Sequence, residues 1–277
     1  LRDQGKLAEA EPYMRGALES YRRVLGEEHL RTLAAINSTG VLLHTQGKLS
    51  EAEPYFREAL EVGRRVLGDE HPHTLASVGN LGALLHAQGK LSEAEPYFRE
   101  ALEGSRRTLG DEHPRTLSSI SNMGSLLQAQ GKLAEAEPYF REALEVRRRV
   151  LGEEHPNTHS SVNNLGALFV AQEKYADAVA LLDPIEIKAR AAFTGANARR
   201  LAALLVTLGK ARAGLHDFAA AEANLLEAQP IFVTTRGPTH KDTLECTQAL
   251  VDLYTAWHAA EPDNGYDLKV AEWRAKL

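Results

Sequence analysis

The sequence predicts an all-α protein that is built as a linear array of antiparallel helix pairs. The segment GKLSEAEPYFREALE occurs without change at 47–61 and again at 89–103. Related segments begin at Gly5, Gly131 and Glu173, so that successive starts lie 42 residues apart. Within each unit, apolar residues recur at steps of three and four, as they do along one face of an α-helix. A regular period of this length is typical of a repeat array.

The composition excludes several classes of protein. Apolar residues make up 43% and charged residues 25% of the 277 positions, and no apolar run approaches the about 20 residues that a membrane-spanning helix needs. The formal net charge is −6, and Lys and Arg are mixed with Asp and Glu. Nucleic acid binding needs clustered positive charge, so we expect neither nucleic acid nor a membrane as a partner. The single cysteine, Cys246, predicts a reducing compartment such as the cytoplasm.

Each repeat contains a second helix that follows a Gly-Lys pair. Around 50–67 this helix is predicted from its apolar stripe, and Ser50 with Glu53 fits a capping box, as does Ser92 with Glu95. The prolines of these helices are expected near the first turn, where few backbone N–H groups are engaged. The stripe consists of Leu49, Ala52, Phe56, Ala59, Leu60, Val62 and Val66, and the prolines are Pro12, Pro54, Pro96 and Pro138.

The first helix of each repeat follows a turn of sequence Leu-Gly-acid-acid-His-Pro, at 67–72, 109–114 and 151–156. Gly68 suits a helix end that requires a left-handed residue, and Pro72 suits the first position of the next helix. In that helix we expect a buried stripe and a glycine, Gly82, that lets a partner helix approach closely. The stripe consists of Leu75, Val78, Leu81 and Leu85.

The last third of the chain departs from this template. Asp183-Pro184 is expected to interrupt a second helix, and FTGAN at 193–197 replaces the usual turn. The register then returns one residue late, a final long helix is expected from Lys241 to about His258, and a short helix follows. We therefore predict a regular array at 1–190 with a truncated first unit, divergent units at 191–258, and a capping helix at 259–277. Residues 1–4 match 43–46, which predicts a fragment of a longer protein.

These helix pairs resemble the tetratricopeptide repeat. The segment NNLGALFVAQEKYADA at 163–178 has the Leu-Gly of that family's first helix and the small Ala of its second, and Phe56, Phe98 and Phe140 stand at its aromatic position. The 42-residue period and the LGxxHPxT turn are similar to the longer repeats of kinesin light chains and of many bacterial proteins. The resemblance implies a right-handed α-solenoid. The C-terminal end also resembles the repeat regions of planctomycete-type serine/threonine protein kinases.

Candidate catalytic and metal-binding residues are few. One histidine per repeat stands in the turn, too far from the next to share an ion, so we expect a role at the helix start. The pairs His71/His73 and His155/His159 remain candidates for an adventitious metal. No nucleotide-binding or kinase motif occurs in the chain. We expect no catalytic residue, no metal and no cofactor here, and a kinase domain would lie upstream. The turn histidines are His29, His71, His113, His155 and His240.

Arginine pairs recur near the ends of the second helices, beside paired acids in the turns. Two interpretations remain open, namely stabilising contacts with helix ends and neighbouring acids, or a basic stripe that recognises an acidic peptide. The arginine pairs are Arg22-Arg23, Arg64-Arg65, Arg106-Arg107 and Arg148-Arg149, and the acids are Glu27-Glu28, Asp69-Glu70, Asp111-Glu112 and Glu153-Glu154.

The resemblance implies a concave groove lined by the first helices, in which asparagines bind a peptide backbone. The matching positions here are Asn80, Asn122 and Asn164, whereas Thr207 and Ala249 end the series. An alternative is that the asparagines hydrogen-bond between neighbouring first helices. The candidate groove residues are Asn37, Ser38, Asn80, His86, Asn122, Ser125, Gln128 and Asn164.

The predicted function is therefore a non-catalytic scaffold that binds an extended peptide of a partner protein. We expect a monomer or weak self-association, within a larger bacterial signalling protein. The alternative is a structural or self-associating repeat protein without a dedicated peptide ligand, because the middle units are nearly identical and an open apolar end favours stacking.

Overall fold

The computed structural model describes residues 7–277, so the predicted repeat start at Gly5 and the match of residues 1–4 lie outside the described residues. Helices account for 84% of the structure, and residues 7–277 contain thirteen α-helices and no strand. The predicted all-α solenoid is confirmed. None of these helices is long and apolar enough to cross a membrane. The chain divides into two compact units, Leu1–Val150 and Leu151–Leu277.

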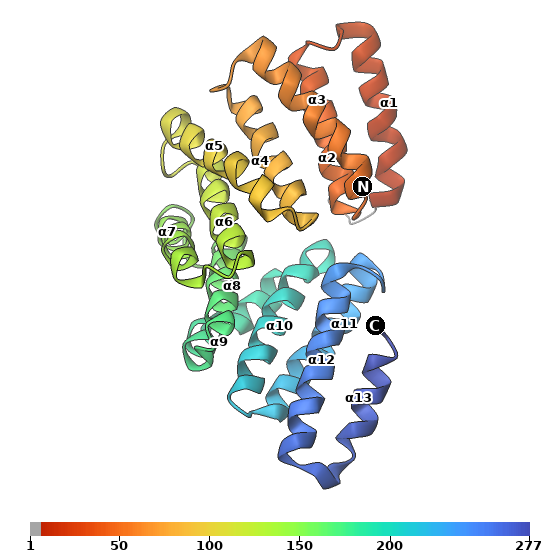
Figure 1. Ribbon diagram of the computed structural model, residues 1–277, viewed down its shortest axis with the longest axis vertical. Helices are drawn as coiled ribbons and strands as arrows, with labels where there is room; N and C mark the ends of the chain where they lie inside the picture. Colours follow the sequence, from red (N-terminus) through yellow and green to blue (C-terminus); the bar gives the residue numbers. More distant parts are fainter. Residues whose placement is uncertain (1–6) are drawn as a thin grey trace. The chain divides into compact units, whose positions relative to one another are not determined.

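First and second helices alternate within both units (Figure 1). The first unit contains α1 (Leu7–Leu25), α2 (Leu30–Thr45), α3 (Leu49–Leu67), α4 (Pro72–Ala87), α5 (Leu91–Leu109), α6 (Pro114–Ala129) and α7 (Leu133–Leu151). The second unit contains α8 (Pro156–Ala171), α9 (Tyr175–Ala192), α10 (Ala198–Gly214), α11 (Phe218–Arg236), α12 (Lys241–Ala260) and α13 (Tyr266–Arg274), with short 3₁₀ turns at Gly195–Asn197 and Pro262–Asn264. The domain boundaries expected at 190 and 258 remain predictions.

On each first helix from α2 to α10, a glycine packs against a large side chain of the following second helix. A Cβ atom at Gly82 would lie 2.9 Å from Phe98 Cδ1, so only glycine allows this approach of α4 to α5. The prediction for Gly82 is confirmed. The same contact joins Gly40 to Phe56, Gly124 to Phe140, Gly166 to Leu182 and Gly209 to Leu225.

The predicted core is largely confirmed. Leu75, Val78, Leu81 and Leu85 of α4 are all buried, as are Ala52, Phe56, Ala59, Leu60 and Val62 of α3. The prediction that Val66 belongs to the core is wrong, since the residue is 40% exposed. It lies on the last turn of α3, where its neighbour Leu67 packs against the core while Val66 faces solvent.

The turns before the first helices form as predicted. Gly68 has φ +87°, and Pro72 is the first residue of α4. His71 is the N-cap, and its Nδ1 accepts a hydrogen bond from the backbone N–H of His73 at 3.2 Å. The ring nitrogen thus satisfies a donor that the helix leaves unpaired. The same cap occurs at His29, His113, His155 and His240.

The capping boxes predicted at Ser50 and Ser92 are wrong. Helices α3 and α5 begin one residue earlier, at Leu49 and Leu91, and their N-caps make no side-chain hydrogen bond. The end of the preceding helix explains the early start. Gly47 has φ +77°, and the Lys48 N–H closes a 2.9 Å hydrogen bond to the Leu43 carbonyl, so the chain reverses tightly and the next helix starts at once.

The prolines lie deeper inside their helices than predicted. Pro54 is the sixth residue of α3, and Pro12, Pro96 and Pro138 occupy the same place in their helices. Pro184 does not interrupt α9, which runs from Tyr175 to Ala192. Both Pro184 and Ala180 are exposed, so the carbonyl that loses its donor can bond to water on the solvent side of the helix.

Aromatic stacking closes the C-terminal end of the second unit. The Trp257 ring of α12 stacks on Phe218 of α11 at 5.6 Å between centroids and on Tyr266 of α13 at 4.2 Å. Tyr254 stacks on both Trp257 and Tyr266. These contacts hold the short helix α13 against the last helix pair, and its role as a cap of the array stays a prediction.

Candidate functional site

The asparagine positions of the first helices fall into two groups. In the first unit, Asn80 of α4 donates a hydrogen bond from Nδ2 to Asn37 Oδ1 of α2 at 3.0 Å. Both side chains are half-buried. At this position the alternative interpretation holds, because the carboxamides tie neighbouring first helices together. Ser38, the position that matches Asn80 by repeat spacing, makes no such bond.

Asn122 of α6 and Asn164 of α8 form the second group. Each is half-buried. Neither carboxamide is hydrogen-bonded to another group within residues 7–277. Their helices carry small residues one turn further on, Ser125 and Ala167 respectively. The Ser125 hydroxyl donates to the Ser121 carbonyl at 3.0 Å, so it is satisfied within its own helix.

The remaining candidate residues have varied surroundings. His86 of α4 is half-buried, and its ring lies 6.3 Å from that of Phe98, measured between centroids. Gln128 of α6 is half-buried as well. His86 therefore belongs partly to the packing of α4 against α5, whereas Gln128 remains a polar candidate on the first-helix face.

A ladder of glutamine and glutamate side chains links helices within the first unit, and the sequence did not reveal it. Gln88 Nε2 donates to Glu53 Oε2 at 3.0 Å, and Gln130 donates to Glu95 at the same distance. These bonds, followed by those from the arginine four residues on, lower the pKa of both glutamates. Glu53 and Glu95 thus bridge two helices and are not part of a capping box. A glutamate and a glutamine recur at these positions in each repeat, and this recurrence is the sequence signal that could have predicted the contact.

The arginine pairs join successive repeats in opposite directions. Arg64 of α3 contacts Glu100 of α5 at 2.6 Å, and Glu100 is the main reason that the pKa of Arg64 is raised. The adjacent Arg65 points the other way and contacts Glu28, in the preceding turn, at 3.1 Å. The forward contacts are Arg22–Glu58, Arg64–Glu100 and Arg106–Glu142, and the backward ones are Arg65–Glu28, Arg107–Glu70 and Arg149–Glu112. These partners favour the stabilising interpretation over an acidic-peptide stripe.

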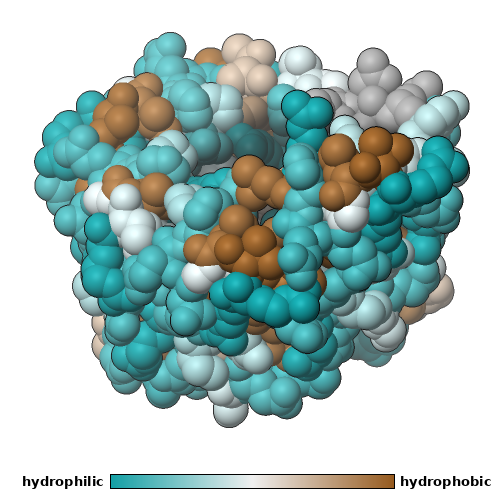
Figure 2. Space-filling model, turned by 90° about the horizontal axis from the view of Figure 1, so that it is seen from above, coloured by the Kyte–Doolittle hydropathy of each residue, from teal (hydrophilic) through white to brown (hydrophobic). Residues whose placement is uncertain are grey.

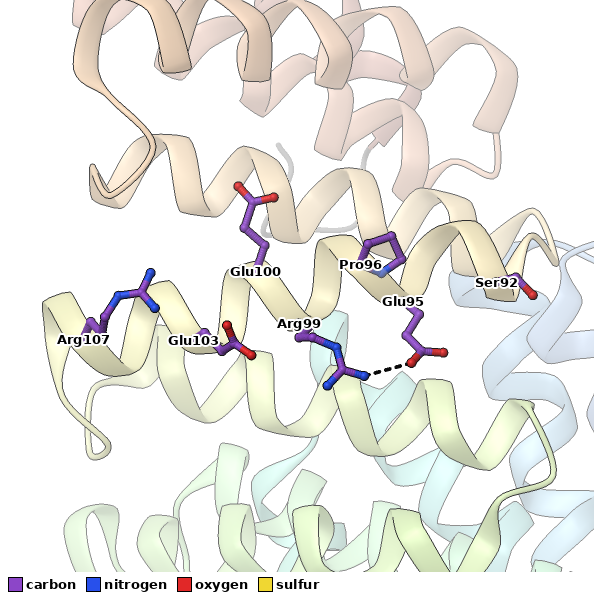
Figure 3. A pocket seen from close by; sticks show the side chains of 7 residues that line it. All are labelled: Ser92, Glu95, Pro96, Arg99, Glu100, Glu103 and Arg107. Carbon is purple, nitrogen blue, oxygen red and sulfur yellow. Dashed lines mark hydrogen bonds and ion pairs between the residues drawn. The ribbon is translucent and has the colours of Figure 1, made fainter.

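A surface hollow lies along one second helix of the first unit. One cavity of about 400 Å³ is lined by α5 alone (Figure 3), and Arg99 in it contacts Glu95 at 2.9 Å. Both arginines of this hollow are already paired, Arg99 with Glu95 and Arg107 with Glu70, so it offers no free cation to a ligand. Its lining residues are Ser92, Glu95, Pro96, Arg99, Glu100, Glu103 and Arg107.

The candidate metal-binding and nucleophilic residues lie apart or serve other roles in the described part of the chain. Within residues 7–277, His, Cys, Asp and Glu side chains form no group of three or more that could hold a metal ion. The His71 and His73 rings stack at 5.5 Å, and His155 uses Nδ1 as a helix cap. Cys246 is fully buried, and burial raises the pKa of its thiol to about 12. At neutral pH this thiol is protonated and shielded.

Comparison with known proteins places the chain in a family. A family model described as tetratricopeptide repeat matches residues 1–64, 40–107, 75–127 and 115–183. The chain belongs to the tetratricopeptide repeat family. Repeats of this family indicate a scaffold for contacts between proteins. No curated protein matches the chain.

Several solved structures share the fold. BtubC (BKLC) from P. vanneervenii is 22% identical, covers 84% of this chain and 93% of its own, and superposes with a TM-score of 0.65. A putative kinesin light chain of Podosopora anserina with nearly identical TPR-like repeats is 22% identical, with coverage of 75% and 98% and a TM-score of 0.59. The predicted likeness to kinesin-light-chain-like repeats is thereby confirmed for the fold.

A Rap protein complexed with competence and sporulation factor superposes with a TM-score of 0.71 at 15% identity, and covers 99% of this chain and 71% of its own. At such identities the likeness concerns the fold alone. What these proteins bind therefore enters only as support for a proposal.

Proposed function

We propose that the chain binds an extended peptide segment of a partner protein along its first helices, without catalysis. In the first unit Asn122 would pair with a peptide backbone, and in the second unit Asn164 would do so. A carboxamide offers one acceptor and two donors, which match the N–H and C=O of a peptide group. The Rap protein structure, solved with competence and sporulation factor, supports a ligand-binding role for this fold.

One observation carries the proposal. Asn80 has an internal partner in Asn37, whereas the half-buried carboxamides of Asn122 and Asn164 have none within residues 7–277. A half-buried polar group without a partner forgoes about 1 kcal/mol of net hydrogen-bond free energy. A bound peptide backbone would supply the missing partner, and the small side chains of Ser125 and Ala167 leave room beside it.

Binding to a peptide library tests the proposal. Peptides selected with the wild type should bind Asn122→Ala and Asn164→Ala about tenfold more weakly, which corresponds to about 1.4 kcal/mol for each lost pair of bonds. Asn80→Ala is the matched control, because its carboxamide is already engaged and its loss should lower stability more than affinity. Equal affinity of all three variants and the wild type would rule out the asparagine site.

We further propose that the array recruits partners for a larger bacterial signalling protein in the cytoplasm, and that its ligands are not nucleic acids. The single buried Cys246 suits a reducing compartment, and the C-terminal end resembles the repeat regions of serine/threonine kinases. The sequence of the gene upstream of Leu1 tests this context. A glycine-rich loop and an HRD motif there would support it, and an unrelated reading frame would contradict it.

Self-association is a second candidate, favoured by exposed apolar side chains on α1. Tyr13 and Val24 each have an exposed fraction of 72%. On the face drawn in Figure 2, apolar side chains form several separate groups among hydrophilic ones. If α1 is an interface, light scattering should show a dimer that Tyr13→Ser with Val24→Ser converts to a monomer. A monomeric wild type at high concentration excludes this candidate.

A further inference from the structure

The solvent side of α11 differs in charge from that of the regular second helices. A line of five exposed positions runs along α3 at steps of three or four residues, and three of them are charged, namely Arg57, Glu61 and Arg65. The same line recurs in α5 and α7. In α11 the matching positions are also exposed but uncharged, so this helix lacks the charges that keep a solvent side polar. They are Ala219, Ala223, Leu226, Pro230 and Thr234.

Helix α9 carries a similar exposed line. Its charged member, Asp183, is paired with Arg212 of α10 at 2.8 Å. Ile187 in the middle of this line is 80% exposed, and Leu226 in the line of α11 is 41% exposed. Both lines therefore present apolar side chains where the regular second helices present charged ones. The line of α9 consists of Ala176, Ala180, Asp183, Ile187 and Ala191.

These two lines form one surface, the α9/α11 face. Helices α9 and α11 both pack against α10. Their side chains also meet directly, in an ion pair between Arg190 and Glu227 and in a hydrogen bond from Asn224 Nδ2 to Glu186 Oε1 at 3.4 Å. Each line follows about four helix turns, or roughly 22 Å, and two helices side by side are about 20 Å wide. The α9/α11 face thus covers roughly 450 Å².

The size of the α9/α11 face suits a single helix. Apolar patches of about 300 to 600 Å² are the largest that most monomers expose, and they are often functional. A stable dimer of compact subunits buries about 800 Å² on each partner, which is more than this face provides. One helix of about four turns has the length of the two lines and can lie along them.

The residues of the face indicate what such a helix must carry. Alanine predominates in the line of α9, so a partner can approach closely and large apolar side chains can fill the space between the two helices. Pro184 and Pro230 lack the N–H that the carbonyls of Ala180 and Leu226 would accept in a regular helix. These two residues are exposed, and their carbonyls can accept hydrogen bonds from a partner.

The charges beside the face disfavour a membrane surface. Asp177 lies in the first turn of α9, Asp217 is the N-cap of α11, and both are exposed. The nearby Lys174 has its ammonium 5.8 Å from the Phe169 ring centroid. Anionic lipids attract surfaces that are rich in Lys and Arg. Acidic residues at this end complement a basic residue of a partner instead.

We propose that the α9/α11 face binds one amphipathic helix of a partner protein. This helix is about four turns long and has large apolar residues at every third or fourth position, with Lys or Arg at the end that lies over Asp177 and Asp217. The site is separate from the asparagines of the first helices, and it does not depend on the extended-peptide site proposed there.

A display library of helical peptides is the probe, with about 18 residues each and Leu, Phe or Met at every third or fourth position. Peptides selected on the whole chain should bind the wild type saturably, become helical on binding, and bind Ile187→Glu/Leu226→Arg about tenfold more weakly or worse. This variant keeps the net charge and restores the residue types that Glu61 and Arg57 provide at matching positions, so it should fold. Equal affinity for both proteins, or no helical binder at all, overturns the site.

Two control variants separate the surfaces. Glu61→Gln/Glu103→Gln alters the same line in the first unit and should bind the helical peptides like the wild type, and a loss as large as that of Ile187→Glu/Leu226→Arg would contradict the assignment. Asn122→Ala/Asn164→Ala should also keep these peptides while it loses extended ones. Either proposal can therefore fail without the other.

Two other occupants are distinguished by the same variant. If sedimentation equilibrium shows a wild-type dimer that Ile187→Glu/Leu226→Arg converts to a monomer, a second copy covers the face and the partner-helix assignment fails. If the wild type floats with vesicles of phosphatidylcholine and phosphatidylserine and the variant does not, a membrane is the occupant and the assignment fails as well. We expect neither result, together with binding of the selected helical peptides.

Discussion

The regular repeats of the first unit and the divergent repeats of the second keep the same helix-to-helix packing but hold it with different polar contacts. Gly82 against Phe98 in the first unit corresponds to Gly209 against Leu225 in the second. The shape of the contact persists although the aromatic ring has become an aliphatic side chain. Close approach of a glycine to a large apolar side chain is therefore a contact that both units share.

The polar contacts differ far more. In the first unit each arginine of a pair reaches one neighbouring repeat, and the pattern recurs every 42 residues. In the second unit Arg212 contacts Asp183 at 2.8 Å, Glu186 at 3.3 Å and Asn224 at 2.6 Å. Asn224 is buried, and Arg212 is only 18% exposed. The second unit keeps one ladder contact, Arg190–Glu227, but adds this compact network around Arg212, and four predictions test the contrast between network and ladder.

The largest effect is expected from truncation of the large partner of each glycine. Phe98→Ala in the first unit should lower the free energy of unfolding by about 3 to 5 kcal/mol, and Leu225→Ala in the second by about 2 to 5 kcal/mol, because each opens a cavity in a packed core. Urea denaturation followed by circular dichroism measures both. A loss below about 1 kcal/mol at either site would show that this contact is not a shared requirement.

Replacement of the glycine by alanine should lower the free energy of unfolding by a smaller amount. Gly82→Ala places a Cβ 2.9 Å from Phe98 and should destabilise by about 1 to 3 kcal/mol through overpacking. Gly79→Ala on the same helix is the control, since its Cβ would meet Ala101 at an ordinary 3.6 Å. That variant should be as stable as the wild type or more stable by up to about 1 kcal/mol. Equal losses in both variants would contradict the packing account.

The two kinds of polar contact should respond unequally to removal of an arginine. Arg212→Ala leaves Asn224 and the mostly buried Glu186 without this donor, and should cost about 1 to 3 kcal/mol. Arg64→Ala breaks a contact whose side chains are 42% and 36% exposed, and should cost less than about 1 kcal/mol. Thermal unfolding in low and high salt distinguishes them, because salt screens only the exposed pair strongly. Equal losses would remove the distinction between network and ladder.

The smallest effect concerns the loss of stability at acidic pH. His159 stands where the regular repeats have Leu75 and Leu117, its side chain is buried, and burial lowers its pKa. An unfolded histidine titrates near about 6.5, so the folded state loses stability as the pH falls below that value. His159→Leu should weaken this loss between pH 7.5 and 5.5, measured as the change in Tm. A variant that loses as much stability as the wild type would place the acid sensitivity elsewhere, for example at His73 or His240, whose pKa values are lowered too.

The sequence predicted those features that recur with the repeat and depend on helix periodicity. The helix pairs, the contact of Gly82 and the cap at His71 follow from spacing and local backbone chemistry. The contacts that it could not predict join residues whose side-chain directions depend on packing. Asn80 bonds to Asn37 and not to the repeat-matched Ser38, and Glu53 turns toward Gln88 and not toward Ser50. The prediction for Pro184 is wrong, because the opposite face of α9 is buried and this packing keeps the helix continuous past the proline.

Titration of the protein with a selected peptide, followed through the side-chain NH₂ signals of its asparagines by nuclear magnetic resonance, tests the central claim most directly. The account predicts that the Asn122 and Asn164 signals shift and saturate with the binding curve, while the Asn80 signal stays near its free position. A peptide that binds tightly without shifting the signals of Asn122 and Asn164 would contradict the asparagine face as the binding site.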